Sequence, residues 1–147
     1  HPVYWQKIQE ETKGSGDIER STCLFIDSEN AREHTEEEMI PVENIKGRLF
    51  LVGAEDDSFW ETGKYIRRMD ERLKERPHTC EYVPLVYEHG THFVLPESLL
   101  RKALPVGLKF VMRFIFKAAK EYPNECEKTR KDIDRRLSSA LKEWREE

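Results

Sequence analysis

An aspartate pair and a histidine are the residues of this sequence with the clearest capacity for chemistry. Asp56 and Asp57 follow an apolar run that ends in Gly53, and His92 lies in the segment EHGTHF (88–93) after a second run. A carboxylate that orients an imidazole allows the ring to act as a general base, which can activate a serine or cysteine nucleophile. The sequence therefore offers an acid, from one of the two aspartates, and a base.

Each of these residues also has a structural interpretation that the sequence leaves open. Two aspartates after a glycine can cap a helix N-terminus, where the macrodipole favours negative charge. His92 can be a hydrogen-bonded structural histidine, and Trp60 can serve packing instead of substrate contact. The most direct interpretation of the aromatic run is a place in the core, with an acyl channel as the alternative; this run comprises Phe110, Phe114 and Phe116.

The elements that must position the acid and the base form a strand–helix–strand unit over residues 48–87. Residues 49–52 are continuously apolar, as in a parallel strand buried on both faces. Residues 59–76 have apolar positions at helical spacing and end before Pro77. Residues 79–87 predict a second strand, in which Pro84 indicates an edge or a bulge. Parallel strands joined by a right-handed crossover would bring the two loops to one edge of the sheet.

Further helices are predicted over 97–103, 106–121 and 126–145, the last with Ile133, Leu137, Leu141 and Trp144 on one face. Residues 22–26 predict a short strand or cap piece, and the acidic residues 27–39 are expected to be helical in part. Two strands are too few for a sheet covered on both faces. We therefore expect the sheet to be completed by further strands of the same domain or by a partner chain in a homo-oligomer.

Two stretches of the sequence are long enough to compare with known families: IPVENIKGRLFLVGAEDDSFW (40–60) and YEHGTHFVLPES (87–98). Together they resemble the C-terminal domain of acyl-CoA thioester hydrolases and bile acid-CoA:amino acid N-acyltransferases. The order of acid and histidine also matches that of α/β-hydrolases. In the family, the catalytic aspartate is the second of its pair and lies three residues before a tryptophan, which here implies Asp57, since Trp60 follows. Counting from Gly53 implies Asp56 instead. The catalytic base implied by the resemblance is His92, and His89 is expected to be a loop residue.

The resemblance implies an α/β fold: the C-terminal part of an α/β-hydrolase, with an incomplete sheet. Residues 1–147 would form a single partial domain, with a cap-like segment at 1–40 and core strands and helices at 41–147. The chain has no G-x-S-x-G motif. In the family the nucleophile lies upstream, so we expect this chain alone to be inactive and the complete protein to act on acyl-CoA or another ester. Alternatives are acyl transfer to an amine, another ester or peptide hydrolase branch, and a non-catalytic interaction module.

The composition of the chain bears on its partners and on the state of its cysteines. The net charge of −4 lacks the basic excess of a nucleic-acid binder, and no apolar stretch approaches the roughly 20 residues of a membrane span. We expect no nucleic-acid or membrane partner, no cofactor and no metal. The three cysteines are far apart, which favours free or buried thiols in a reducing cytoplasm. The chain starts at His1 without Met, so we expect a processed product or a fragment.

Overall fold

A computed structural model describes Glu29 and residues 35–146 of the chain. The predictions for residues 22–26, and for most of the cap-like segment 1–40, lie outside the described residues. Of the acidic segment 27–39, the described part contains one 3₁₀ turn, η1 (Glu36–Glu38). A second 3₁₀ turn, η2 (Val42–Asn44), follows and leads into the sheet. The single-domain organisation stays a prediction.

The centre of the structure is a parallel pair of strands, β1 (Arg48–Ala54) and β2 (Glu81–Tyr87). The helix α3 (Thr62–Glu75) connects them, as predicted for the strand–helix–strand unit. The register pairs Arg48 with Glu81 at one end and Ala54 with Tyr87 at the other. Pro84 stands opposite Leu51 within β2. Because Ala54 and Tyr87 are paired, both strands finish at the same height, and the loops that follow them begin side by side.

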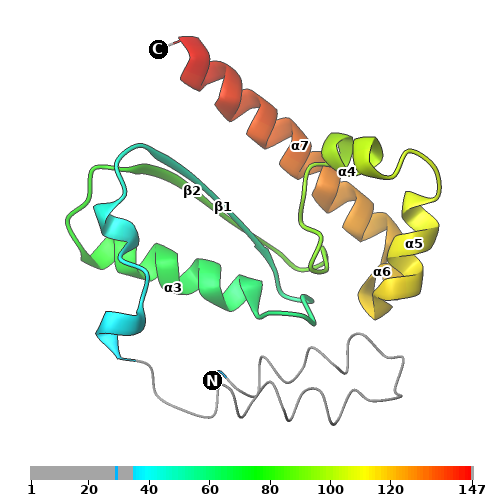
Figure 1. The fold of residues 1–147 in the computed structure, drawn as a ribbon, viewed down its shortest axis with the longest axis horizontal. Coiled ribbons are helices and arrows are strands. Elements are labelled where there is room, and N and C mark those ends of the chain that lie inside the picture. The colour runs from blue at the N-terminus through cyan, green and yellow to red at the C-terminus, as the bar shows by residue number, and fades with distance from the viewer. Residues whose placement is uncertain (1–28, 30–34, 147) are drawn as a thin grey trace.

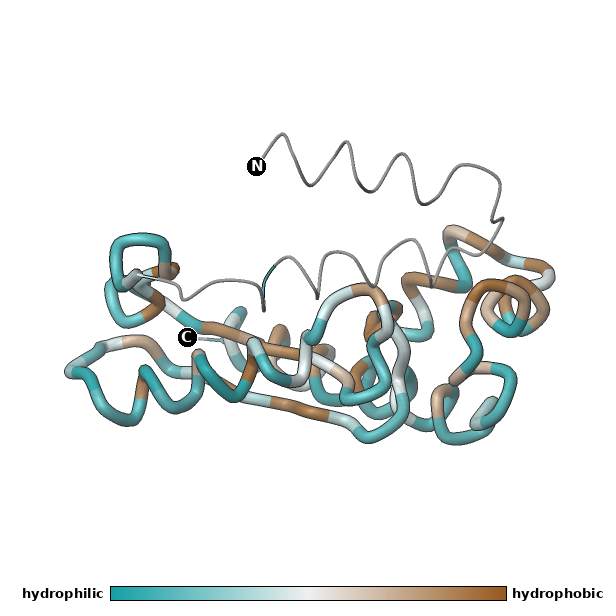
Figure 2. The backbone as a smooth tube through the Cα atoms, turned by 90° about the horizontal axis from the view of Figure 1, so that it is seen from below, coloured by the Kyte–Doolittle hydropathy of each residue, from teal (hydrophilic) through white to brown (hydrophobic). Residues whose placement is uncertain are grey.

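Helices cover both faces of this strand pair, and α3 and α7 (Pro123–Glu146) lie on opposite sides of it (Figure 1). On one face, Leu49 packs with the fully buried Leu73 of α3. On the other face, Phe50 and Val52 pack with the buried Ile133 of α7. Adjacent residues of a strand point to opposite faces, so a strand covered on both faces must be apolar at consecutive positions. This explains the apolar run in β1, whose residues 49–52 are nevertheless half-buried and not fully buried as predicted. Both strands carry hydrophobic stretches (Figure 2).

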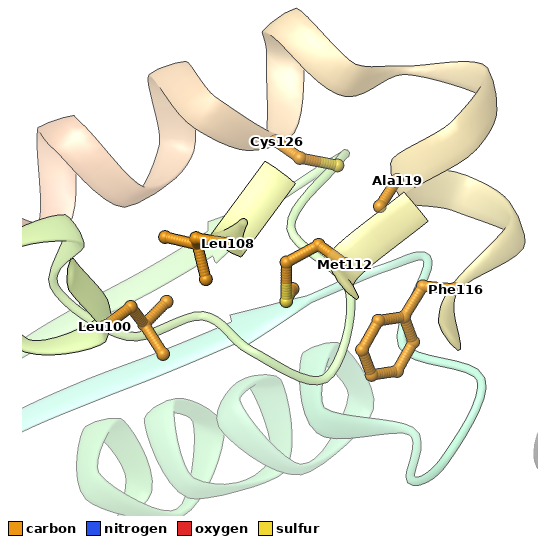
Figure 3. Packing of buried hydrophobic residues seen from close by; sticks show 6 residues of the cluster. All are labelled: Leu100, Leu108, Met112, Phe116, Ala119 and Cys126. Atoms are coloured by element: carbon orange, nitrogen blue, oxygen red, sulfur yellow. The ribbon is translucent and has the colours of Figure 1, made fainter. Parts of the chain in front are cut away.

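A second core lies beyond β2, among three short helices and the start of α7. These helices are α4 (Glu97–Ala103), α5 (Leu108–Ile115) and α6 (Lys117–Glu121). Their buried side chains meet around Met112 and Phe116, as Figure 3 shows, and the cluster comprises Leu100, Leu108, Met112, Phe116, Ala119 and Cys126. A buried ion pair between Glu97 and Arg130, at 2.7 Å, ties α4 to α7.

The single helix predicted over 106–121 is interrupted, and α5 and α6 are separate. Phe116 has φ −115° and ψ 125°, an extended conformation that ends α5 and begins α6. This break turns the Phe116 ring into the core, where it contacts the rings of Phe59 and Phe93 at centroid distances of 5.1 and 5.4 Å. Of the three phenylalanines expected in the core, Phe116 is buried, whereas Phe110 and Phe114 are exposed.

Two further sequence predictions are met only in part. The helix expected from residue 59 begins at Thr62, because residues 55–61 form the loop that carries the aspartates. On α7, Ile133 is buried but Leu141 is 52% exposed, since α7 extends past the end of the core. Cys80 and Cys126 are buried free thiols, and Cys23 lies outside the described residues.

Candidate active site

The loops after β1 and β2 meet at the carboxyl ends of the two strands, where ligands bind in open α/β sheets. The first loop (55–61) carries Asp56 and Asp57, and the second (88–96) carries His89 and His92. A hydrogen bond of 2.8 Å from the Glu55 amide to the Tyr87 carbonyl joins the starts of the loops. The sheet register thus brings together the residues that the sequence singled out.

Asp57 is the residue of the pair that contacts His92. Its Oδ2 lies 3.1 Å from His92 Nδ1, and its side chain is fully buried. Oδ1 accepts hydrogen bonds from the amides of Phe59 (2.9 Å) and Trp60 (3.1 Å), and Oδ2 also accepts one from the Thr62 hydroxyl (2.8 Å). A buried carboxylate is tolerated only when such donors satisfy it. Both oxygens are held, so the carboxylate has a fixed orientation toward the ring.

The surroundings of His92 fix its plane and leave one edge accessible. Phe59 stacks on the ring at a centroid distance of 5.1 Å, and Trp60 meets it edge-on at 4.9 Å. Because a carboxylate only accepts, Nδ1 must donate, and the neutral ring then has its lone pair on Nε2. Nε2 makes no hydrogen bond to any described residue, and the side chain is 25% exposed. The ring is thus arranged to take a proton at Nε2.

Asp56 has a different partner, although it lies next to Asp57 in the sequence. Its Oδ1 accepts hydrogen bonds from the amides of Gly90 (2.9 Å) and Thr91 (2.8 Å), and its Oδ2 lies 3.3 Å from His89 Nδ1. His89 is in turn stacked on Tyr122 at a centroid distance of 3.9 Å. Asp56 therefore fastens the histidine loop to the aspartate loop, at a distance from the His92 ring.

The loop that carries His92 has a backbone conformation that non-glycine residues rarely adopt, and the hydrogen bonds to Asp56 stabilise it. Thr91 is fully buried and has φ 62°, the left-handed region that non-glycine residues rarely adopt. Its hydroxyl accepts a hydrogen bond of 3.2 Å from the Phe93 amide. Gly90 is in close contact with β1 and α7, since a Cβ placed there would lie 3.1 Å from Ala54 Cβ and 3.3 Å from Thr129. These contacts determine the direction in which His92 leaves the backbone.

Three residues of the site were not singled out from the sequence as part of the chemistry. Thr62 reaches Asp57 from the first turn of α3, and its hydroxyl also accepts a hydrogen bond of 3.2 Å from the Ala54 amide. Phe59 was expected on the apolar face of a helix and Thr91 was not singled out. The sequence did offer a signal for Thr62, because it lies five residues after Asp57, within reach of the loop that follows β1. For Thr91 the sequence offers no signal, because nothing marks a non-glycine residue with positive φ.

The sequence contains no G-x-S-x-G motif, the usual setting of a nucleophile for such a pair. The buried Cys126 has its pKa raised to about 11 by burial, which disfavours the thiolate. No cluster of three or more His, Cys, Asp or Glu side chains that could hold a metal ion occurs in the described part of the chain. No described helix is both long and apolar enough to cross a membrane.

Parallel strands covered by helices on both faces, with an acid and a histidine after consecutive strands, define an incomplete α/β fold of the hydrolase type. The chain belongs to the family described as BAAT / Acyl-CoA thioester hydrolase C terminal, whose sequence profile matches residues 6–98. The match spans more than half of the chain and both motifs, so the predicted family is confirmed. Neither the curated proteins nor the solved structures include a match to this chain.

Proposed function

We propose that this chain supplies the acid and the base of a catalytic triad in an acyl-CoA thioester hydrolase. The observation that carries the proposal is the contact between Asp57 Oδ2 and His92 Nδ1, at 3.1 Å, at the ends of the parallel strands. The family supports an acyl-CoA thioesterase- or acyltransferase-like C-terminal domain. Asp57 is the proposed acid, and Asp56 is assigned the structural role of holding the loop of His92.

In the proposed reaction, His92 Nε2 takes the proton of a serine or cysteine supplied by the part of the domain that carries G-x-S-x-G or its cysteine counterpart. The freed oxygen or sulfur attacks the thioester carbonyl, the C–S bond breaks, and Nε2–H protonates the leaving thiolate of CoA. Water then gives a proton to Nε2 and attacks the acyl carbon. The bond from that carbon to the serine oxygen or cysteine sulfur breaks, Nε2–H returns a proton to this atom, and the carboxylic acid leaves. In both steps Asp57 holds the ring in one tautomer and stabilises the imidazolium.

An amine could replace water in the second step, so amine acyl transfer is the variant of this proposal that the family also supports. A non-catalytic interaction module is the second candidate. Both candidates take the remainder of the hydrolase domain, or a partner copy, as the element that completes the sheet. The cytoplasmic location stays a prediction.

The test is a thiol-release assay with acyl-CoA substrates on the complete protein, with an amine acceptor present or absent. We expect CoA release that falls by three orders of magnitude or more in His92→Ala, because the base is lost. His89→Ala is the matched control: it lies three residues earlier in the same loop and also contacts an aspartate. Unchanged activity in a folded His92→Ala protein contradicts the triad, and a folded but inactive wild-type protein favours the interaction module.

A further inference from the structure

Helix α5 presents apolar side chains to solvent as well as to the core. Its inner residues Leu108 and Met112 point into the cluster shown in Figure 3. On the outside, Val106, just before the helix, is 89% exposed, and Phe110 and Phe114 are 75% and 83% exposed. Positions four apart share one side of a helix, so Phe110 and Phe114 form a stripe, with Val106 leading into it. We call these three residues the α5 outer face.

The segment that carries the α5 outer face differs in charge from the whole chain. Residues 98–120 contain no Asp or Glu, although the chain carries a net charge of −4. The same segment contains six cations: Arg101, Lys102, Lys109, Arg113, Lys117 and Lys120. Lys109 pairs with Glu127 of α7 at 2.6 Å. Lys102, Arg113 and Lys120 are exposed and make no ion pair within the described residues.

Large exposed apolar surface on a protein usually marks a binding surface. Here the cations define the chemistry of the partner as anionic, and the phenylalanines require it to be apolar below its charged layer. A bilayer with anionic headgroups has both properties, and helices that combine a Phe-containing stripe with Lys and Arg lie in its interface. No described helix could span a membrane, so the binding would be peripheral.

We propose that the α5 outer face binds the surface of an anionic bilayer. Phe110 and Phe114 enter the boundary between headgroups and acyl chains, while Lys102, Arg113 and Lys120 lie among the phosphates. The expectation from the sequence, which assigned no membrane partner, considered only spanning segments. Phe116, the residue directly after α5, points into the core and contacts Phe59, which stacks on His92. The proposal does not depend on the proposed function, because its test measures binding without catalysis.

The test is flotation of the full chain with vesicles of phosphatidylcholine, with or without phosphatidylserine. We expect binding to the vesicles that contain phosphatidylserine and a loss of binding as salt is raised, since headgroup attraction is screened. A Phe110→Ser/Phe114→Ser protein should bind about 100-fold more weakly, because two aromatic side chains no longer leave water. Leu141→Ser, at a residue of α7 that is 52% exposed, is the matched control and should bind as the wild type does.

Charge variants give a second measurement that does not alter the apolar surface. Lys102→Gln, Arg113→Gln and Lys120→Gln should each weaken binding about fivefold, and Lys142→Gln on α7 should not. Equal binding to both kinds of vesicle overturns the proposal, as does unchanged binding of the double serine variant with a native circular dichroism spectrum. Dimerisation of the wild type in sedimentation, lost in that variant, would identify a second copy as the occupant and would equally overturn it.

Discussion

Replacing Asp57 by Asn separates the orientation of His92 from the shape of the site, because the two side chains have nearly the same size. The amides of Phe59 and Trp60 donate to Oδ1, so the oxygen of the new carboxamide must take that position. Its NH₂ group then occupies the position of Oδ2 and faces His92 Nδ1. Since NH₂ donates, Nδ1 must accept, and the ring is forced to carry its proton on Nε2.

A ring with its proton on Nε2 cannot remove a proton from a nucleophile. We expect Asp57→Asn to lower the activity of the complete enzyme by about 10⁴-fold, the cost of the wrong tautomer in a triad. The two backbone hydrogen bonds to Oδ1 would no longer be made to a charged group, which costs about 1 kcal/mol each. The free energy of unfolding should therefore fall by about 2 kcal/mol. Nitrogen-15 NMR of the histidine ring in this chain reports the tautomer directly.

Asp56→Asn is a matched control, because Asp56 also accepts two backbone amides on one oxygen and faces a histidine with the other. It should lose a similar amount of stability, about 2 kcal/mol, with the protonated nitrogen of His92 unchanged and only a small loss of activity. The reasoning is refuted if both variants fold and Asp56→Asn has the larger loss of activity. It is also refuted if His92 keeps its proton on Nδ1 in Asp57→Asn.

Three further predictions concern the framework of the site. Gly53→Ala should destabilise the protein by about 1–3 kcal/mol in denaturant titration, because the new Cβ would lie 2.7 Å from the Thr62 carbonyl oxygen; a neutral result would contradict the close packing of β1 on α3. Arg130→Met should lower the free energy of unfolding by about 3–5 kcal/mol, because Glu97 stays buried without its main partner. The double variant Glu97→Leu/Arg130→Met should recover most of this stability. Equal stability of the single and double variants would argue against the ion pair. Hydrogen bonds from Arg72 lower the pKa of Glu43 from its ordinary 4.5 to about 2, so this carboxylate stabilises the fold above pH 4.5 and loses that contribution as the pH falls toward 2. In acid titrations followed by circular dichroism, Glu43→Gln should therefore be less stable at neutral pH and less sensitive to acid, and a parallel curve would contradict this linkage.

The sequence predicts the strand–helix–strand unit well because its signals are local. The apolar run of β1 matches a strand that helices cover on both faces, although its residues 49–52 are only half-buried, and Pro77 marks where the helix must have ended. From these elements alone, the loops of Asp57 and His92 could be placed at one edge of the sheet. Their roles in catalysis stay predictions, and the choice between Asp56 and Asp57 needed the family resemblance, because neighbouring aspartates have identical chemistry.

Other features depend on contacts between distant segments and were not predictable. Nothing local marks Phe116 as a helix break, since its conformation follows from packing against Phe59 and Phe93. Phe110 and Phe114 were expected in the core because aromatic residues usually are buried there, yet the core beneath α5 is already filled by Leu108 and Met112. The hydrogen bonds by which Asp56 holds the loop of His92 depend on the positive φ of Thr91, 35 residues away.

The register of β1 and β2 determines whether Asp57 and His92 can come into contact. One residue of a parallel strand advances about 3.3 Å, and a hydrogen bond tolerates only a few tenths of an ångström. A slip of one residue also reverses the faces of the strand, so the smallest slip that keeps the core is two residues, about 6.6 Å. No such misaligned form could keep Asp57 in contact with His92. The pair therefore assembles only when the strands are correctly aligned, and any chemistry that it supports would report correct folding.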